Sequence, residues 1–138
     1  DAAHERELLR SGDRRDLIPN LTPVLGPEAV MRAQQLVRAI HVAEPLLDYA
    51  QTLIARTRDR SDLKLGLSPR AGQGLIRAAQ AWARLAGRPA VLPEDVQAVM
   101  PAVISHRLER HQTGPHDSPG APAGGVAEEL IRSVPVPL

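Results

Sequence analysis

The chain has 138 residues, 43% of them hydrophobic, which suits one domain with a moderate core and excludes a wholly disordered protein. Its net charge is +1, with sixteen arginines and one lysine, so it lacks the basic excess that points to nucleic acid, and we expect no such partner. It shows no Cys, no signal peptide and no long apolar run, which excludes disulfides, thiol chemistry and membrane insertion and predicts a cytoplasmic protein.

The first element is a short amphipathic stretch over residues 1–16, which carries Leu8 and Leu9 and contains the turn residues 11–13. We interpret it as the end of a preceding domain and its linker. An ordinary N-terminal helix with a frayed end is the alternative. Two prolines then predict an extended loop over residues 16–22.

Two helices are predicted next. Residues 27–40 keep a helical period, and we expect their apolar face, including Leu36 and Ile40, to face the core. Residues 43–58 repeat the pattern, with a proline tolerated in the first turn. The apolar positions of this third helix are Leu46, Leu47, Ala50, Leu53 and Ile54. The arginine-rich stretch over residues 56–62 is interpreted as a solvated helix end and loop rather than a binding patch.

The segment from Ser68 to Gly87 carries the clearest helix signals in the chain. Ser68 is a good N-cap, Pro69 fits the first helical position because its missing N–H costs nothing there, and Gly87 suits a left-handed residue after the last turn. These signals predict a helix over residues 69–86. Its apolar positions recur at helical spacing and are Leu75, Ile76, Ala79, Trp82, Ala83 and Ala86.

Arg70 stands in the first turn of this helix, where a cation is unfavourable because the unpaired N–H groups already make this end positive. An anion would resolve the conflict, since the helix dipole, the free amides and the guanidinium fork all favour negative charge. Ser68, Pro69 and Arg70 are therefore candidate phosphate-binding residues. A solvated arginine, at a cost of roughly a few tenths of a kcal/mol, is the alternative.

A fourth helix is predicted from Pro93, with two acids in its first turn and a kink at Pro101. The run over residues 112–125 is rich in Gly and Pro and predicts a flexible linker. Residues 126–138 combine a short apolar helix with an alternating tail, which we expect to dock on this domain or on another one. The residues expected to dock are Val126, Leu130, Ile131 and Val134.

These segments predict an all-α fold, with a bundle of about four main helices over residues 17–111, at most a small β patch, and a C-terminal extension. The scarcity of aromatic residues agrees, because closely packed helices can be filled by Leu, Val, Ile and Ala more readily than a sheet can. The expected core consists of Leu36, Ile40, Leu47, Ile54, Leu75, Ala79, Ala83, Val96, Met100 and Ile104.

Other kinds of site lack the residues that they need. His106 and the two histidines after it are spaced five residues apart, which does not match a helical metal pair, and His41 suits a structural role. Gly72 and Gly74 lie inside a helix pattern, so they predict close helix packing rather than a dinucleotide loop. No phosphate-binding loop and no strand ending in paired acids is present, so this chain alone is not expected to hydrolyse ATP.

A specific resemblance connects these observations. The run GLSPRAGQGLIRAAQAWARLAGRPAVLPEDVQAVMPAVISHRL, residues 66–108, resembles the C-terminal lid of MoxR-type AAA+ ATPases in four features. They are the S-P-R-A start, the G-R after the helix, the P-x-D-V start of the next helix and the terminal H-R. The resemblance extends more loosely through HVAEPLLDYAQTLIARTR to the VPVP ending. The family's usual hydroxyl residue before the proline is Leu92 here, which cannot cap, so we expect that helix start to be weaker by roughly 1 kcal/mol than a Thr would make it.

The resemblance implies a role for one residue above all: Arg70 would be the sensor 2 arginine, which reaches from the lid to the terminal phosphate of the nucleotide. It also implies that residues 1–16 end an ATPase core. The intact protein would then be a chaperone-like ATP hydrolase that uses ATP and Mg²⁺ and works in a ring, often a hexamer, with its own core and neighbouring subunits as partners. Its clients would be proteins to be remodelled, commonly ones with von Willebrand factor A domains. The alternative is a stand-alone helical interaction or DNA-binding module that uses residues 56–60.

Overall fold

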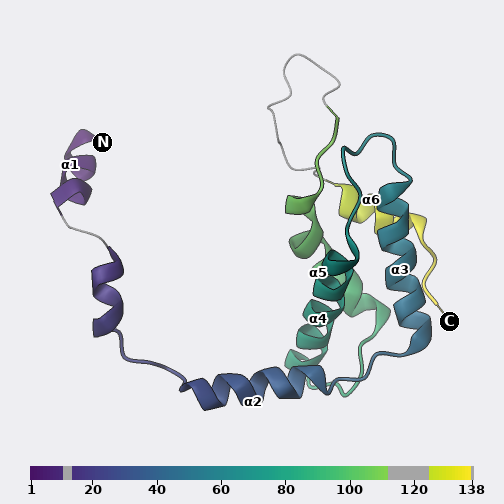
Figure 1. Ribbon diagram of the computed structural model, residues 1–138, viewed down its shortest axis with the longest axis horizontal. Helices are drawn as coiled ribbons and strands as arrows, with labels where there is room; N and C mark the ends of the chain where they lie inside the picture. Colours follow the sequence, from purple (N-terminus) through teal and green to yellow (C-terminus); the bar gives the residue numbers. More distant parts are fainter. Residues whose placement is uncertain (11–13, 112–124, 138) are drawn as a thin grey trace. The chain divides into compact units, whose positions relative to one another are not determined.

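The computed structural model describes residues 1–10, 14–111 and 125–137 (Figure 1). The predicted flexible linker therefore lies outside the described residues, except for its last position. Two compact units are present, residues 1–32 and 33–138, and each is considered by itself. The predicted domain boundaries stay predictions.

The first unit contains α1 (Ala2–Arg10), the 3-10 helix η1 (Arg14–Asn20) and the start of α2 (Pro27–Arg38). The prediction of an extended loop over residues 16–22 was wrong for residues 16–20, because η1 continues through Pro19 to Asn20. The fixed φ of proline, near −65°, is compatible with a 3-10 helix, so a proline alone does not distinguish the two conformations.

Helix α2 forms where the periodicity predicts it, but none of its residues is buried. The expectation that its apolar face packs in the core was wrong, and Leu36 is 42% exposed. Ile40, two residues beyond the helix end, is the first buried residue of this region. An amphipathic pattern indicates that a face can be covered, but it does not say that this chain supplies the cover.

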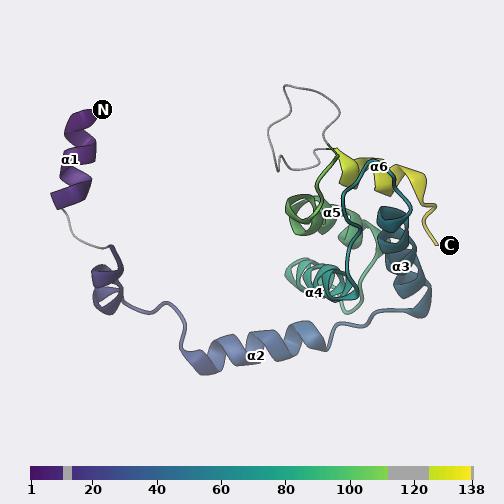
Figure 2. The same cartoon turned by 45° about the horizontal axis from the view of Figure 1, so that its top comes forward.

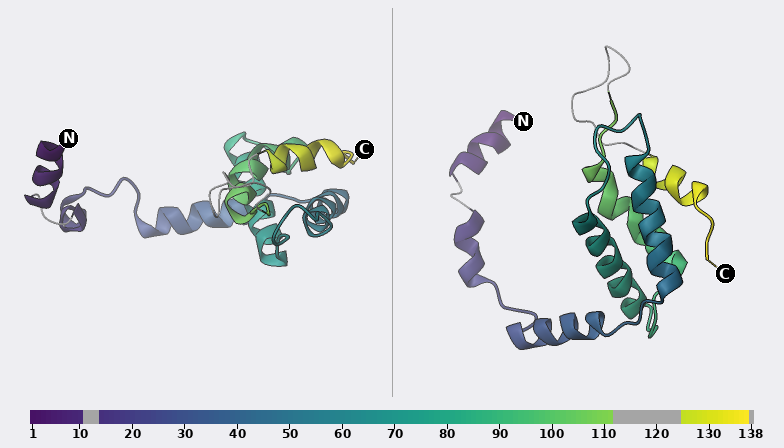
Figure 3. Two further views of the ribbon diagram at one scale, coloured as in Figure 1. Left: turned by 90° about the horizontal axis from the view of Figure 1, so that it is seen from above. Right: turned by 45° about the vertical axis from the view of Figure 1, so that its right-hand side comes forward.

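The second unit is a helical bundle. It consists of α3 (Glu44–Arg58), α4 (Pro69–Leu85) and α5 (Pro93–Ile104), with the 3-10 turn η2 (Ser105–Arg107) directly after α5. Helices α3, α4 and α5 run roughly alongside one another, and α6 (Val126–Ser133) crosses over α3 and α5 (Figures 1 and 2). The two views of Figure 3 show the same arrangement from other sides. The all-α prediction is confirmed.

Only isolated β-bridges occur among the described residues. His41 pairs in parallel with Ala90, and Leu63 pairs antiparallel with Arg110. The first bridge is held by His41 N–H donating to Pro89 O at 3.0 Å and Val91 N–H donating to His41 O at 2.9 Å. His41 thus contributes its backbone to the fold while its side chain is exposed.

Helix α4 begins and ends as its sequence predicts. Ser68 is the N-cap, and its side chain accepts a hydrogen bond from the backbone N–H of Ala71 at 3.3 Å. At the other end Gly87 adopts φ 72°, the left-handed conformation that glycine tolerates without a Cβ clash. The N–H of Arg88 then donates to the carbonyl of Ala83 at 2.9 Å, which satisfies one of the last free carbonyls of the helix.

Helix α5 begins without a side-chain cap at Leu92, as the sequence predicts. Asp95 compensates in part, because its carboxylate accepts a hydrogen bond from the Leu92 N–H at 2.8 Å. That carboxylate is 1% exposed and also pairs with the guanidinium of Arg88. The connector between α4 and α5 is therefore closed by one buried acid, since the charge of Arg88 offsets the cost of burying the carboxylate.

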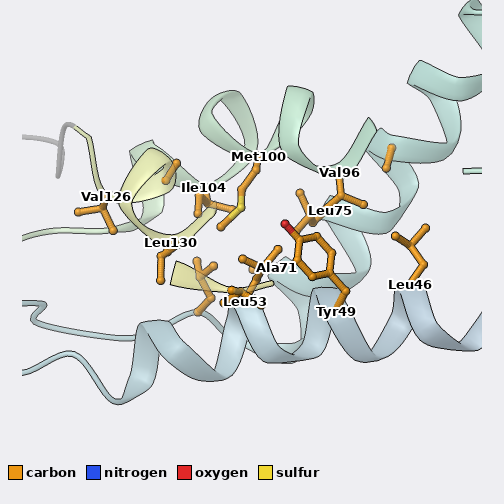
Figure 4. Close-up of a cluster of buried hydrophobic side chains, with 14 of the residues drawn as sticks. Leu46, Tyr49, Leu53, Ala71, Leu75, Val96, Met100, Ile104, Val126 and Leu130 are labelled. Carbon is orange, nitrogen blue, oxygen red and sulfur yellow. The ribbon is translucent and has the colours of Figure 1, made fainter. Parts of the chain in front are cut away.

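The core lies where α3, α4, α5 and α6 meet (Figure 4). Ile40, Leu75, Ala79, Ala83, Val96, Met100 and Ile104 are buried, as predicted. The prediction that Leu47 lies in the core was wrong, because its side chain is 38% exposed. Ile54 is only partly buried and packs against the core from its edge. Helix α3 instead buries Leu46, Tyr49, Ala50, Leu53 and Thr57. Where two apolar residues are adjacent, as Leu46 and Leu47 are, the sequence does not show which of them faces the core. Their directions differ by about 100° around the helix axis.

Helix α6 completes this core. Val126 is fully buried, Leu130 is 2% exposed and Val134 is 5% exposed, while Ile131 packs against the cluster from its edge. The C-terminal residues therefore dock on this domain. Within the described ranges, no helix has the combination of length and apolarity needed to cross a membrane.

Candidate functional site: an arginine-lined groove at the start of α4

The start of α4 is positioned by the end of α3. The backbone of Leu67, which directly precedes the N-cap, is bound on both sides: its N–H donates to Thr57 Oγ1 at 2.8 Å, and its carbonyl accepts from Arg58 Nε at 3.0 Å. Thr57 is fully buried and donates its own hydroxyl proton to the carbonyl of Ile54 at 2.6 Å. The segment that carries Ser68 is therefore fixed against α3.

Arg70 is the second residue of α4, directly after Pro69, and its side chain is exposed. The first turn of α4 contains no acidic residue. Among the residues that the structure describes, the guanidinium of Arg70 has no hydrogen-bond or ion-pair partner. A cation is thus held beside the positive end of the helix dipole with nothing to neutralise it.

Arg70 lines an open groove of about 960 Å³ between α3 and α4. Its walls include Leu47 and Ile54, which explains why these apolar residues of α3 are not fully buried in the core. Four arginines contribute to the lining, and no Asp or Glu does. They are Arg58 from the last turn of α3, Arg70 and Arg77 from α4, and Arg107 from η2.

Three other arginines of this unit, Arg60, Arg88 and Arg110, are paired with acids, in contrast to those of the groove. Arg60 contacts Asp62 at 2.7 Å and Glu129 at 2.6 Å, and Arg110 contacts the same two acids at 2.6 Å and 2.9 Å. The hydrogen bond from Arg60 is the main reason that the pKa of Asp62 falls to about 2, and it likewise lowers the pKa of Glu129. The groove therefore gathers four arginines that have no ion pair in the described part of the chain.

The two glycines of α4 differ in their surroundings. A Cβ at Gly72 would lie 2.4 Å from Ile54 Cδ1, so this glycine allows α3 and α4 to approach closely at the groove floor, as predicted. A Cβ at Gly74 would meet nothing within 4 Å, so close packing does not explain that residue. Further along α4, Gln80 donates to the carbonyl of Ile40 at 2.8 Å and accepts from Arg77 Nη1 at 3.0 Å.

The described residues contain no group of three or more His, Asp, Glu or Cys that could hold a metal ion. The four arginines of the groove suit an anionic ligand by their charge, whereas Mg²⁺ prefers several oxygen donors gathered in one place. His106 and His111 belong to no such group, and His116 lies outside the described residues.

Comparison with known proteins agrees with this geometry. The model of the AAA lid domain family matches residues 55–124, about half of the chain, and this range includes the whole of α4 and α5. The chain belongs to the AAA lid domain family. The groove with Arg70 is therefore a feature of a AAA lid.

Individual relatives show which kind of lid this is. The lid is 33% identical over 99 residues to the chaperone MoxR1 of Mycobacterium tuberculosis. This match covers 65% of this chain and 26% of MoxR1. A stretch of 43 residues, 31% of this chain and 13% of the relative, is 58% identical to the protein MoxR of Paracoccus denitrificans. A match at 29% identity to YeaC, an uncharacterized protein of Bacillus subtilis, covers 97% of this chain and 41% of YeaC. The lid is of the MoxR type.

A solved structure from Cytophaga hutchinsonii, described as a candidate ATPase, shares the fold of the lid. The TM-score is 0.73 at 22% identity, over 100% of this chain and 44% of that one. The chain thus spans less than half the length of each relative named here.

Sequence reasoning and structure meet at the start of α4. Pro69 and Arg70 line the groove, and Ser68, which directly precedes them, caps the helix as expected. The sequence places Arg58 at the solvated end of the third helix, and it gives no site signal for Arg77 or Arg107. These residues belong to segments that are far apart in the sequence, so only the tertiary structure brings them to one surface.

Proposed function

We propose that this lid closes over ATP bound in the ATPase core of the intact protein and presents Arg70 to the γ-phosphate as the sensor 2 arginine. One observation carries the proposal: Arg70 is exposed and unpaired within the described residues, at the open N-terminus of α4, on a groove without acids. Ser68 and Pro69 hold the helix start in place, and the free end of the helix adds its dipole to the positive field.

The chemistry of this role is electrostatic. Negative charge spreads over the γ-phosphate oxygens as the phosphoryl group is transferred, and a positioned guanidinium stabilises it through charge-assisted hydrogen bonds. The bonds of Thr57 and Arg58 to Leu67 fix the backbone that leads into α4, so the lid carries this cation on a preformed helix start. The residues that bind Mg²⁺ and activate water belong to the core.

The intact protein, in this proposal, is a chaperone-like ATP hydrolase that works as a ring, with six subunits as the expected number. The lid contacts its own core and a neighbouring subunit, and its rigid-body swing on hydrolysis transmits force to a client. A protein with a von Willebrand factor A domain is the expected client. The support for this part is the similarity to MoxR proteins, one of which is named as a chaperone.

The test is steady-state ATP hydrolysis by the full-length protein with Arg70→Ala. We expect turnover to fall about tenfold or more, the scale of one positioned donor to a developing charge. The melting temperature should barely change, because an exposed first-turn cation contributes little to stability. Arg84→Ala, an exposed arginine in the last turn of the same helix, is the matched control and should keep full turnover. Equal turnover of wild type and Arg70→Ala would refute the sensor assignment.

A further inference from the structure

We propose that Arg58, at the end of α3, is a second phosphate-contacting residue that binds the same polyphosphate as Arg70 from the opposite wall of the groove. This inference rests on the proposed function, because it assigns the ligand of the groove to the nucleotide. It adds a residue from another helix to the phosphate site.

The position of Arg58 is fixed along most of its side chain. Its Nε donates to the carbonyl of Leu67 at 3.0 Å, and a Cβ on Gly66 would lie 2.5 Å from Arg58 Cγ and 2.7 Å from its Cα. The loop backbone thus passes directly over the stem of Arg58, in a space that only glycine leaves open. An arginine held in this way has already lost most of the side-chain entropy that ligand binding would otherwise cost.

The free end of Arg58 is what remains available for binding. Its Nη1 and Nη2 groups have no partner within the described part of the chain, and the residue lines the groove together with Arg70. Leu67, which receives the Nε bond, is three residues before Arg70 in the same fixed segment. Both arginines are therefore anchored to one short piece of backbone, Arg58 through its Nε bond to Leu67 and Arg70 through its own place three residues later.

Two unpaired arginines on one acid-free surface repel each other, and a multiply charged anion relieves that repulsion while accepting bidentate hydrogen bonds from both. A polyphosphate has several anionic groups along its length, so it can accept hydrogen bonds from the guanidinium groups of Arg58 and Arg70 at the same time. The phosphodiester backbone of nucleic acid offers the same chemical group, so the experiment must separate the two sources.

The test measures binding of inorganic tripolyphosphate to this 138-residue chain at low salt, by the change of backbone amide chemical shifts. We expect saturable shifts centred on Gly66, Arg70 and Gly72. Arg58→Met keeps the apolar stem that packs against Gly66 and removes the guanidinium. It should weaken the affinity about tenfold, the equivalent of one charge-assisted contact of 1.4 kcal/mol. Arg84→Ala is again the control and should bind like wild type.

The outcomes separate the possible roles of Arg58. Unchanged affinity in Arg58→Met, with or without a lower melting temperature, would show that the residue only anchors the loop and would overturn the inference. Arg58→Lys, which keeps stem and charge, guards against a folding defect and should bind between wild type and Arg58→Met. Tighter binding of a short duplex DNA than of tripolyphosphate, at equal phosphate concentration, would overturn the assignment to a nucleotide.

The inference and the proposed function can fail separately. If Arg70→Ala abolishes hydrolysis while Arg58→Met leaves tripolyphosphate binding intact, the sensor role stands and the role of Arg58 is refuted. If Arg70→Ala leaves hydrolysis of the full-length protein unchanged, the proposed function fails, whatever the groove binds.

Discussion

The hydroxyl of Thr57 binds the backbone of Leu67 at 2.8 Å, and this contact joins the last turn of α3 to the residue before the N-cap of α4. Thr57 is a fully buried polar residue, and its hydroxyl is used twice, once as acceptor and once as donor to Ile54. The segment that presents Arg70 therefore depends on one buried hydroxyl.

Replacing Thr57 by Val should lower the free energy of unfolding by about 1 to 3 kcal/mol, because the buried N–H of Leu67 loses its acceptor while the shape of the side chain is kept. Urea denaturation of the chain measures the change. Thr57→Ser keeps the hydroxyl and loses only a methyl group, so it should be less destabilising than Thr57→Val. The reverse order would show that packing, rather than the hydrogen bond, is what matters at this position.

Replacing Gly66 by Ala should destabilise the domain by about 1 to 3 kcal/mol, the usual cost of overpacking. The new methyl group would meet the backbone of Arg58 at 2.7 and 2.9 Å, and backbone cannot rotate out of the way. Gly26→Ala is the control, because nothing lies within 4 Å of a Cβ there. Thermal unfolding of both variants checks the prediction, and equal melting temperatures would contradict it.

Replacing Asp95 by Ala should cost about 3 kcal/mol, because Arg88 loses its buried partner and the N–H of Leu92 loses its acceptor. Glu94 is paired with the same arginine at 3.1 Å, but its side chain is 72% exposed. Glu94→Ala should therefore change stability by less than about 1 kcal/mol. Chemical denaturation of the two variants compares the buried and the exposed acid that pair with Arg88. Similar losses in the free energy of unfolding would show that burial does not decide the strength of these ion pairs.

The ion pairs of Asp62 and Glu129 with Arg60 and Arg110 predict a loss of stability in acid. The pKa of Asp62 is about 2 in the folded chain against 3.8 ordinarily, mainly because of the hydrogen bond from Arg60, and the pKa of Glu129 is also lowered. A carboxylate with a lowered pKa stabilises the fold above pH 3.8, and this contribution disappears as the pH falls toward 2. Urea midpoints between pH 5 and pH 2 should therefore fall, and added salt should weaken the same pairs.

Asp62→Asn tests which acid is responsible. The variant should show a flatter pH dependence over the same range, because it removes the group whose pKa is lowered. Asp59→Asn is a matched control, since the exposed side chain of Asp59 has no partner in the described residues. A slope that is the same in wild type and Asp62→Asn would exclude this network as the cause of acid sensitivity.

The sequence predicts the helices of this domain better than their faces. Ser68, Pro69 and Gly87 set the ends of α4 through local backbone chemistry, which a sequence displays directly. The face of α3 could not be predicted in the same way, because Leu46 and Leu47 are both apolar and only the tertiary contacts decide which one is buried. Helix α2 shows the same limit, since its amphipathic pattern says nothing of where its partner is.

Only the part of the candidate site that has a local sequence signal could be predicted from the sequence. Arg70 is conspicuous in the first turn of a helix, because its charge opposes the dipole there. Arg58 has no such signal, since an arginine in the last turn of a helix is favoured by the dipole and needs no other explanation. Its place in the groove depends on the hydrogen bond to Leu67 and on the space left by Gly66, and neither can be read from residue types alone.

The position of α6 in the core also constrains how the domain is made. Val126, Leu130 and Val134 belong to one buried cluster with residues of α3 that are synthesised long before them, such as Leu53. While a ribosome is still adding these last residues, the nascent bundle of α3, α4 and α5 exposes the apolar surface that α6 later covers. Translation must therefore proceed beyond Val134 before the core can close, and until then the unfinished domain carries the exposed apolar surface that makes partly folded chains prone to aggregate.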